Sequence, residues 1–213
     1  MFVDDIYSQG TWQFMSAALL SEPHLNQAIE DDRESAFYVL LYIGLLYTKH
    51  NQVSQKLGSY MEIFDYTTIV NNVAEGGRLK TNFLVTDKEA KALTFQCPPM
   101  NNLIKELRAT FAIRYVEPPS EEAFARYESM KRNPNVFADV LVDHPAALYE
   151  VHKRKLQERG WLVETLERYL SDPEWPQLAD AAELNPIVKD KRRKREERES
   201  QKMKNSSNSK RPK

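Results

Sequence analysis

Apolar residues recur along this chain with helical spacing, and one segment stands out from the rest. Residues 36–47 are apolar on every side of a helix, which predicts a helix that is buried on all sides. The segment has twelve residues, and a helix needs about twenty to cross a bilayer, so we expect a central core helix. Asp31, with Glu34 three residues later, matches a capping box at its start.

Further helices follow from amphipathic spacing and from start and stop signals. Apolar positions recur every three or four residues over 101–115, which predicts a helix with one buried face. The Pro118-Pro119-Ser120 run is expected to end one element and cap the next. His144-Pro145 and Gly160 form a start and stop pair for another helix, and a last helix is expected over 162–170.

The segments between these helices are less regular. A short helix interrupted by Gly58 is expected between Gln52 and Phe64, and Thr86 is expected to cap a helix that runs to Leu93. Cys97-Pro98-Pro99 is expected to break the chain. No segment alternates convincingly between apolar and polar residues, so the predicted fold class is mainly α.

Charge divides the chain into two parts. Residues 189–213 contain twelve Lys and Arg against four Asp and Glu, a net charge of +8, whereas the preceding body has a net charge of −9. The basic segment has few apolar residues and is expected to be disordered, because it cannot bury enough surface to offset chain entropy. We therefore predict a folded domain over 1–188 and a disordered basic tail over 189–213.

The tail contains the basic run Lys191, Arg192, Arg193, Lys194 and Arg195. This run is typical of a nuclear import signal or a nucleic-acid contact. The alternative is that these side chains are only solvated and bind nothing. The tail has no aromatic residue for base stacking, so any nucleic-acid binding would depend on phosphate contacts and would be sensitive to salt.

Cysteine, histidine and the start of the chain exclude several classes of protein. The single cysteine excludes an internal disulfide, and the four histidines have no metal-ligand spacing. The chain begins without a basic and apolar leader, which disfavours secretion. A cytoplasmic or nuclear location is expected, with no metal and no membrane partner.

Two sequence blocks in order carry a family resemblance. The first is Gly-Thr-Trp-Gln-Phe-Met-Ser at 10–16, and the second is Asp-Asp-Arg-Glu-Ser at 31–35, directly before the apolar helix. Together they resemble the end of the activation segment and helix F in the C-lobe of a protein kinase. The chain is most similar to the fungal-type protein kinase family, and the resemblance extends to about Trp175.

The resemblance implies a kinase-like C-lobe fragment built around the buried helix, and it implies roles for particular residues. Gly10 and Thr11 match the loop that holds a peptide substrate, with a plain turn before a helix as the alternative. Asp32 matches the helix F aspartate that accepts backbone hydrogen bonds from the catalytic loop, with helix capping as the alternative.

The chain departs from the kinase pattern in two places. Most kinases have Ala-Pro-Glu where this chain has Ser16-Ala17-Ala18, so the glutamate that pairs with an arginine deeper in the lobe is replaced by Ala18. Arg33 stands where the family usually has leucine. Both differences predict weaker anchoring of the substrate loop.

The catalytic motifs of a kinase do not occur in this sequence. It has no Gly-x-Gly-x-x-Gly, no His-Arg-Asp and no Asp-Phe-Gly, and phosphoryl transfer needs these parts. The family implies ATP and Mg²⁺ as cofactors and Ser/Thr protein phosphorylation as the activity. Without the binding elements, we expect no catalytic residue, no cofactor and no activity from this chain alone.

The expected truncation has a structural consequence. Helix F normally packs against the catalytic loop and helix E, so part of its surface would be exposed, and Asp32 would be a buried carboxylate that has lost its partners. A protein partner covering that surface is one expectation. The alternative function is a non-catalytic protein-binding module whose basic tail serves nuclear targeting or contacts nucleic acid.

Overall fold

The computed structural model describes residues 12–175, apart from 23, 53, 87–91 and 134–137. The described part is mainly helical, as the sequence predicts, with one two-stranded sheet. The proposed boundary at 188/189 and the tail lie outside these residues. In chain order the elements are η2 (Trp12–Phe14, a 3-10 turn), α1 (Ala17–Ser21), α2 (Ile29–Tyr47), α3 (Ser54–Asp65), β1 (Thr67–Val70), β2 (Val73–Gly76), α4 (Arg78–Val85), α6 (Pro98–Ala112), α7 (Glu121–Lys131), α8 (Ala138–Val142), α9 (Pro145–Gln157) and α10 (Trp161–Leu170).

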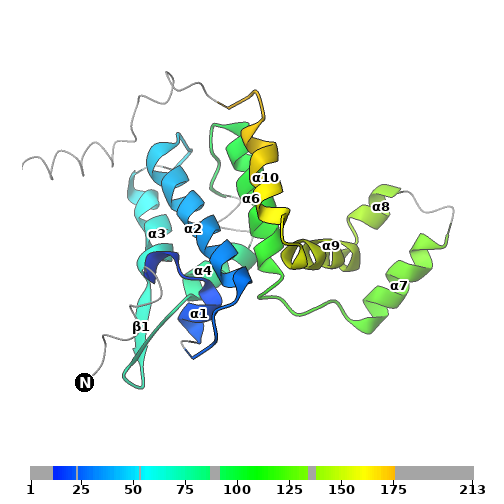
Figure 1. Ribbon diagram of the computed structural model, residues 1–213, viewed down its shortest axis with the longest axis horizontal. Coiled ribbons are helices and arrows are strands. Elements are labelled where there is room, and N and C mark those ends of the chain that lie inside the picture. The colour runs from blue at the N-terminus through cyan, green and yellow to red at the C-terminus, as the bar shows by residue number, and fades with distance from the viewer. Residues whose placement is uncertain (1–11, 23, 53, 87–91, 134–137, 176–213) are drawn as a thin grey trace, which may run out of the picture.

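Helix α2 lies at the centre of the body, between α3 on one side and α6 on the other (Figure 1). Phe37, Tyr38, Leu41 and Leu45 on α2 are completely buried. The same hydrophobic cluster includes residues of α3, α4, α6, α9 and α10. The central helix is thus present, and one face of it forms the middle of the core.

The expectation that residues 36–47 are buried on all sides is wrong. Val39, Ile43 and Tyr47 are 37%, 48% and 51% exposed, and Ala36 is exposed as well. The reason is that the neighbouring elements η2, α3 and α6 cover only part of the circumference of α2. An apolar helix tends to be buried, but whether it is covered depends on the neighbouring elements of the fold.

Helix α6 begins at the prolines and is not interrupted by them. Pro98 occupies the first turn after the N-cap residue Cys97, where the amide that proline lacks would have no intrahelical partner. Thr86 follows the end of α4, and its amide donates to Asn82 O at 2.7 Å. Residues 87–91 of the helix expected after it lie outside the described part of the chain. Helix α3 runs through Gly58 without a break.

A short hairpin between α3 and α4 is an element that the sequence pattern did not predict. Strands β1 and β2 pair antiparallel, with Val70 opposite Val73. Asn71 and Asn72 form the turn with φ angles of 52° and 64°, the left-handed conformation that a two-residue hairpin turn requires and asparagine tolerates. Gly77 follows at φ 82° and connects the hairpin to α4.

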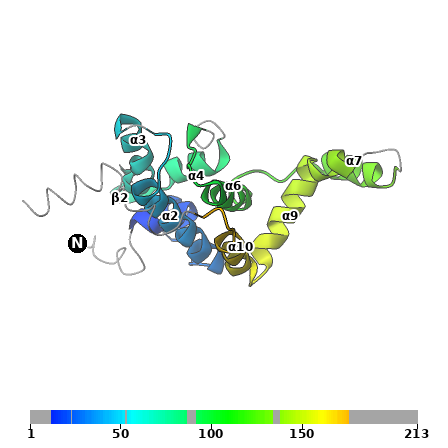
Figure 2. The same ribbon diagram turned by 90° about the horizontal axis from the view of Figure 1, so that it is seen from above.

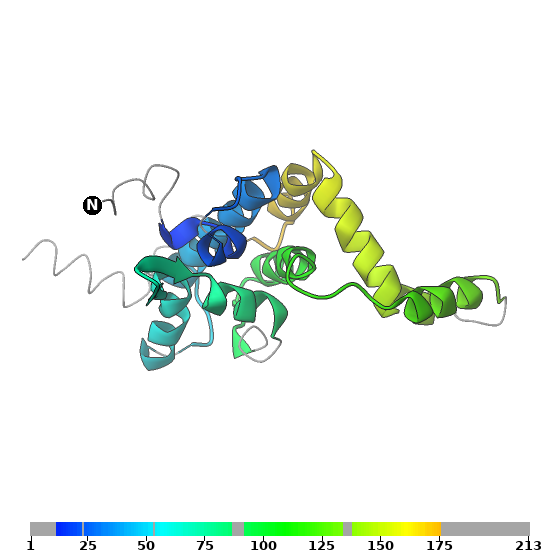
Figure 3. The same ribbon diagram turned by 90° about the horizontal axis from the view of Figure 1, so that it is seen from below.

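Helices α7, α8 and α9 extend away from the body as an arm, as all three views show (Figures 1, 2 and 3). Helix α7 has no buried residue and contacts α9 and α8. Its N-cap is Ser120, whose side chain accepts from the Ala123 amide at 3.2 Å. At the body end of the arm, Leu156 of α9 and Trp161 of α10 enter the core.

Candidate functional site

Several residues to which the sequence assigned a role lie outside the described part of the chain. These are the substrate-loop residues Gly10 and Thr11 and the basic run Lys191, Arg192, Arg193, Lys194 and Arg195. Their roles stay predictions. The structure describes Asp32, the helix that carries it and the segment that follows Gly10 and Thr11.

Asp32 lies in the first turn of α2 and is exposed. Its carboxylate accepts a hydrogen bond from Gln27 Nε2 at 2.5 Å. The expectation of a buried carboxylate is therefore wrong, because the side of α2 that carries Asp32 is open to solvent. The neighbouring residue Asp31 caps the helix instead, because its Oδ2 accepts a hydrogen bond from the Ala28 amide at 2.8 Å. Glu34 is not part of the cap.

The exposed side of α2 forms a continuous strip that begins at Asp32. Ala36, Val39, Ile43 and Tyr47 follow it at intervals of four, three, four and four residues, and all five are exposed. Residues at this spacing share one face of a helix. We call this set the α2 stripe. From Ala36 to Tyr47 it spans about 16 Å, at 1.5 Å per residue.

The opposite side of the N-terminal half of α2 holds buried charge. Glu34 is completely buried, and its carboxylate accepts from the Ala17 amide at 2.8 Å, from Arg114 Nη1 at 2.5 Å and from the Tyr115 hydroxyl. Burial raises the pKa of Glu34, and the Arg114 guanidinium and these hydrogen bonds oppose the rise. The carboxylate thus connects three segments that are far apart in the sequence.

Asp31 extends the same network. It accepts from Arg114 Nη2 at 2.6 Å and from the Ser16 hydroxyl at 2.7 Å. Burial would raise the pKa of Asp31, but the hydrogen bonds from Arg114, Ala28 and Ser16 outweigh it and leave the pKa below its ordinary value. Arg114 is therefore shared by two carboxylates, which together compensate its buried charge.

This network holds the start of α1, whereas the substrate loop Gly10 and Thr11, for which weaker anchoring is expected, lies outside the described residues. Ala18 indeed has no carboxylate, but its amide donates to the Tyr115 hydroxyl at 3.1 Å, and Ala17 is held by Glu34. Arg33 adds an anchor elsewhere, because its guanidinium donates to Leu156 O at 2.6 Å and to Arg159 O at 3.1 Å. The arginine thus fixes the α9–α10 connection to α2.

No local pattern in the sequence points to Arg114, and the pattern around Glu34 predicts a cap. Glu34 and Arg114 are 80 residues apart, so no local pattern connects them. The available signal was a glutamate two residues before the apolar run 36–47. Such a side chain needs a cationic partner when it is buried.

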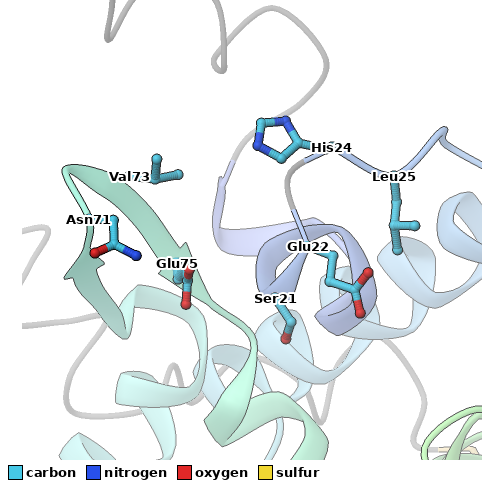
Figure 4. Close-up of a pocket in the computed structure, with 7 residues that line it drawn as sticks. All are labelled: Ser21, Glu22, His24, Leu25, Asn71, Val73 and Glu75. Carbon is cyan, nitrogen blue, oxygen red and sulfur yellow. The ribbon is translucent and has the colours of Figure 1, made fainter.

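A cleft of about 410 Å³ lies between the end of α1 and the β hairpin, lined by Ser21, Glu22, His24, Leu25, Asn71, Val73 and Glu75. In Figure 4, Asn71, Val73 and Glu75 come from the hairpin side, and the other four come from α1 and the loop after it. The side chains do not converge on a common point in that view. The described residues contain no group of His, Cys, Asp and Glu side chains that could hold a metal ion.

Comparison with models of known families, with curated proteins and with solved structures found no match to this chain. Among the described helices, none combines the length and apolar character that a membrane crossing requires.

Proposed function

We propose that this chain is a non-catalytic part of a fungal-type protein kinase lobe, and that its α2 stripe binds the segment of a kinase domain that precedes it in the family. The resemblance of residues 10–16 and 31–35 supports the assignment. The observation that carries it is the position of the α2 stripe. In the family, helix F packs against the catalytic loop and helix E.

The chemistry of the stripe fits such an occupant. Val39, Ile43 and Tyr47 present a row of apolar surface about two turns long, which would gain roughly 25 cal/mol for each Å² covered. Asp32 lies at the start of this row and is exposed, and its Oδ1 accepts from Gln27 Nε2. A carboxylate in that position accepts backbone N–H groups from a loop, which form short, charge-assisted hydrogen bonds.

We also propose that the chain alone has no kinase activity. None of the described residues supplies a phosphate-binding glycine loop or a metal-binding constellation. Because phosphoryl transfer depends on positioning and charge stabilisation, purified chain mixed with ATP, Mg²⁺ and a Ser/Thr peptide should transfer no phosphate.

The binding test uses a purified polypeptide that covers the N-lobe, helix E and catalytic loop of a fungal-type protein kinase and ends after its Asp-Phe-Gly block. Isothermal titration should show binding to the full chain, and Ile43→Lys should weaken that binding at least tenfold, because it places a charge in the middle of the stripe. Ile43 is already 48% exposed, so the variant should fold, which circular dichroism will verify.

Val163→Lys provides the matched control. Val163 on α10 is 58% exposed and lies off the stripe, so this variant should bind like the wild type. Absence of binding by the wild-type chain, or equal binding by the Ile43→Lys variant, would refute the proposal.

A second candidate is a self-sufficient protein-binding module. The compact hydrophobic cluster around α2 favours it, because that cluster is formed from residues of this chain without a further lobe. Thermal unfolding of the purified chain followed by circular dichroism should then show one cooperative transition. A chain that melts without cooperativity would exclude this candidate.

A further inference from the structure

Helix α10 has an inner side that is buried and an outer side that is exposed. Trp161 and Thr165 on the inner side are buried, and α10 packs against α6. Residues three, four and seven positions apart share one side of a helix. The outer side carries five exposed residues at these intervals, namely Val163, Glu164, Glu167, Leu170 and Ser171.

The outer side of α10 combines apolar surface with negative charge. Val163 and Leu170 are 58% and 65% exposed. None of the ion pairs between described residues includes Glu164 or Glu167. The cation of this helix, Arg168, pairs with Glu106 of α6 at 2.8 Å. The two outer glutamates are therefore not compensated by their own helix.

The segment that follows α10 in the sequence has the complementary chemistry. Residues 160–175 contain one Arg against four Asp and Glu, a net charge of −3, whereas residues 189–213 have a net charge of +8. Ile187 and Val188 stand directly before the first of these cations. An apolar pair followed by cations matches an apolar and acidic helix face, because opposite charges attract and covered apolar surface is favourable.

The chain is long enough for this segment to return to α10. Trp175 is held at the C-terminal end of the helix, since its Nε1 donates to Tyr169 O. Twelve residues, 176–187, separate Trp175 from Val188 and can span up to about 40 Å when extended. The ten residues of α10 span about 15 Å. Because the segment is tethered to this face, docking needs fewer contacts than binding between separate molecules.

We propose that residues 187–195 dock along the outer side of α10. The apolar pair covers Leu170 and Val163, and the cations that follow lie beside Glu164 and Glu167. While docked, the basic run is held by this chain and is kept from other anionic partners. Rising ionic strength releases it, because salt screens exposed charges. The inference does not depend on the proposed binding by the α2 stripe, because this side of α10 lies off the stripe.

Nuclear magnetic resonance on the full chain labelled with ¹⁵N tests the docking. In about 50 mM NaCl, the ¹H–¹⁵N nuclear Overhauser effect of residues 187–195 should exceed that of residues 205–213. Raising the salt to about 500 mM should remove the difference, because the Debye length shortens severalfold. The Glu164→Gln/Glu167→Gln double variant should remove it at low salt.

Matched variants separate docking from a general loss of charge. Glu121→Gln/Glu122→Gln removes two exposed glutamates of α7 and should leave the values of 187–195 unchanged. Leu170→Ser removes apolar surface from the proposed site and should lower them. All of these positions are exposed, so the variants should fold, which the amide signals of residues 103–111 of α6 will verify.

Three outcomes would overturn the proposal. One is equal values for 187–195 and 205–213 in the wild type at low salt. Another is a double variant of α10 that keeps the wild-type values. The third is a difference that grows with protein concentration, which would mean that the segment docks on another copy of the chain.

Discussion

Removing Arg114 should destabilise the fold far more than removing a surface cation. The Arg114 side chain is 16% exposed, and its partners Asp31 and Glu34 are 5% and 0% exposed. Arg114→Met keeps most of the apolar stem but leaves two carboxylates facing each other in a buried site. Removing one partner of a buried ion pair costs about 3–5 kcal/mol. This is a large share of the roughly 5–15 kcal/mol that stabilises a typical domain.

The free energy of unfolding that Arg114→Met removes should also depend on pH. Burial already raises the pKa of Glu34, and loss of the guanidinium will raise it further. A carboxyl whose pKa is raised in the folded state destabilises the fold fully above that raised pKa, and the destabilisation shrinks as the pH falls from there to the ordinary pKa. The loss caused by Arg114→Met should therefore be smaller at pH 5 than at pH 7.

Urea unfolding followed by circular dichroism at 222 nm measures both quantities, provided that the transition is two-state. Lys131→Met is the control, because it breaks the exposed Lys131–Glu128 pair of α7 and should leave the free energy of unfolding unchanged. If Arg114→Met has no larger effect than Lys131→Met, the network does not anchor residues 16–18 as described.

Two further predictions concern a backbone position and a second charged cluster. Gly77 has φ 82°, and a Cβ there would lie 2.4 Å from Ala17 O, so Gly77→Ala should cost about 1–3 kcal/mol and lower the melting temperature. Glu106 accepts from Lys155, Arg168 and Tyr169; burial would raise its pKa, but these partners hold it below the ordinary value. Its contribution to stability is present above pH 4.5 and is lost as the pH falls through the lowered pKa. Glu106→Gln should accordingly melt below the wild type at pH 7, with a difference that shrinks between pH 5 and pH 3.

The helices that rest on local signals were predictable from the sequence. The spacing of apolar residues over 101–115 corresponds to α6, whose buried face carries Leu103, Leu107 and Phe111. Ser120 caps α7, as the sequence predicts, and Gly160 lies between α9 and α10. In each of these cases the decisive atoms lie within one or two helical turns of the signal.

Features that depend on distant parts of the chain were not predictable in the same way. The strands Thr67–Val70 and Val73–Gly76 are four residues long, too short for an alternating pattern to be recognised. The paired asparagines between them were the one signal for a hairpin turn. Glu34 accepts from Arg114 and Tyr115, 80 and 81 residues away, and Lys80 donates to Met15, 65 residues away. No local rule identifies these partners.

The two sides of α2 show why its sequence alone was misleading about burial. The buried side tolerates Glu34 and Asp31, because each carboxylate is supplied with donors from Arg114 and from nearby backbone or hydroxyl groups. The exposed side has only apolar residues after Asp32, although water would accept polar ones there. A row of this kind is favourable when another surface covers it, since exposed apolar rows otherwise promote non-specific association. The proposed occupant would bring apolar side chains along the stripe and backbone N–H groups to Asp32, which a helix with an adjoining loop would do better than a helix alone.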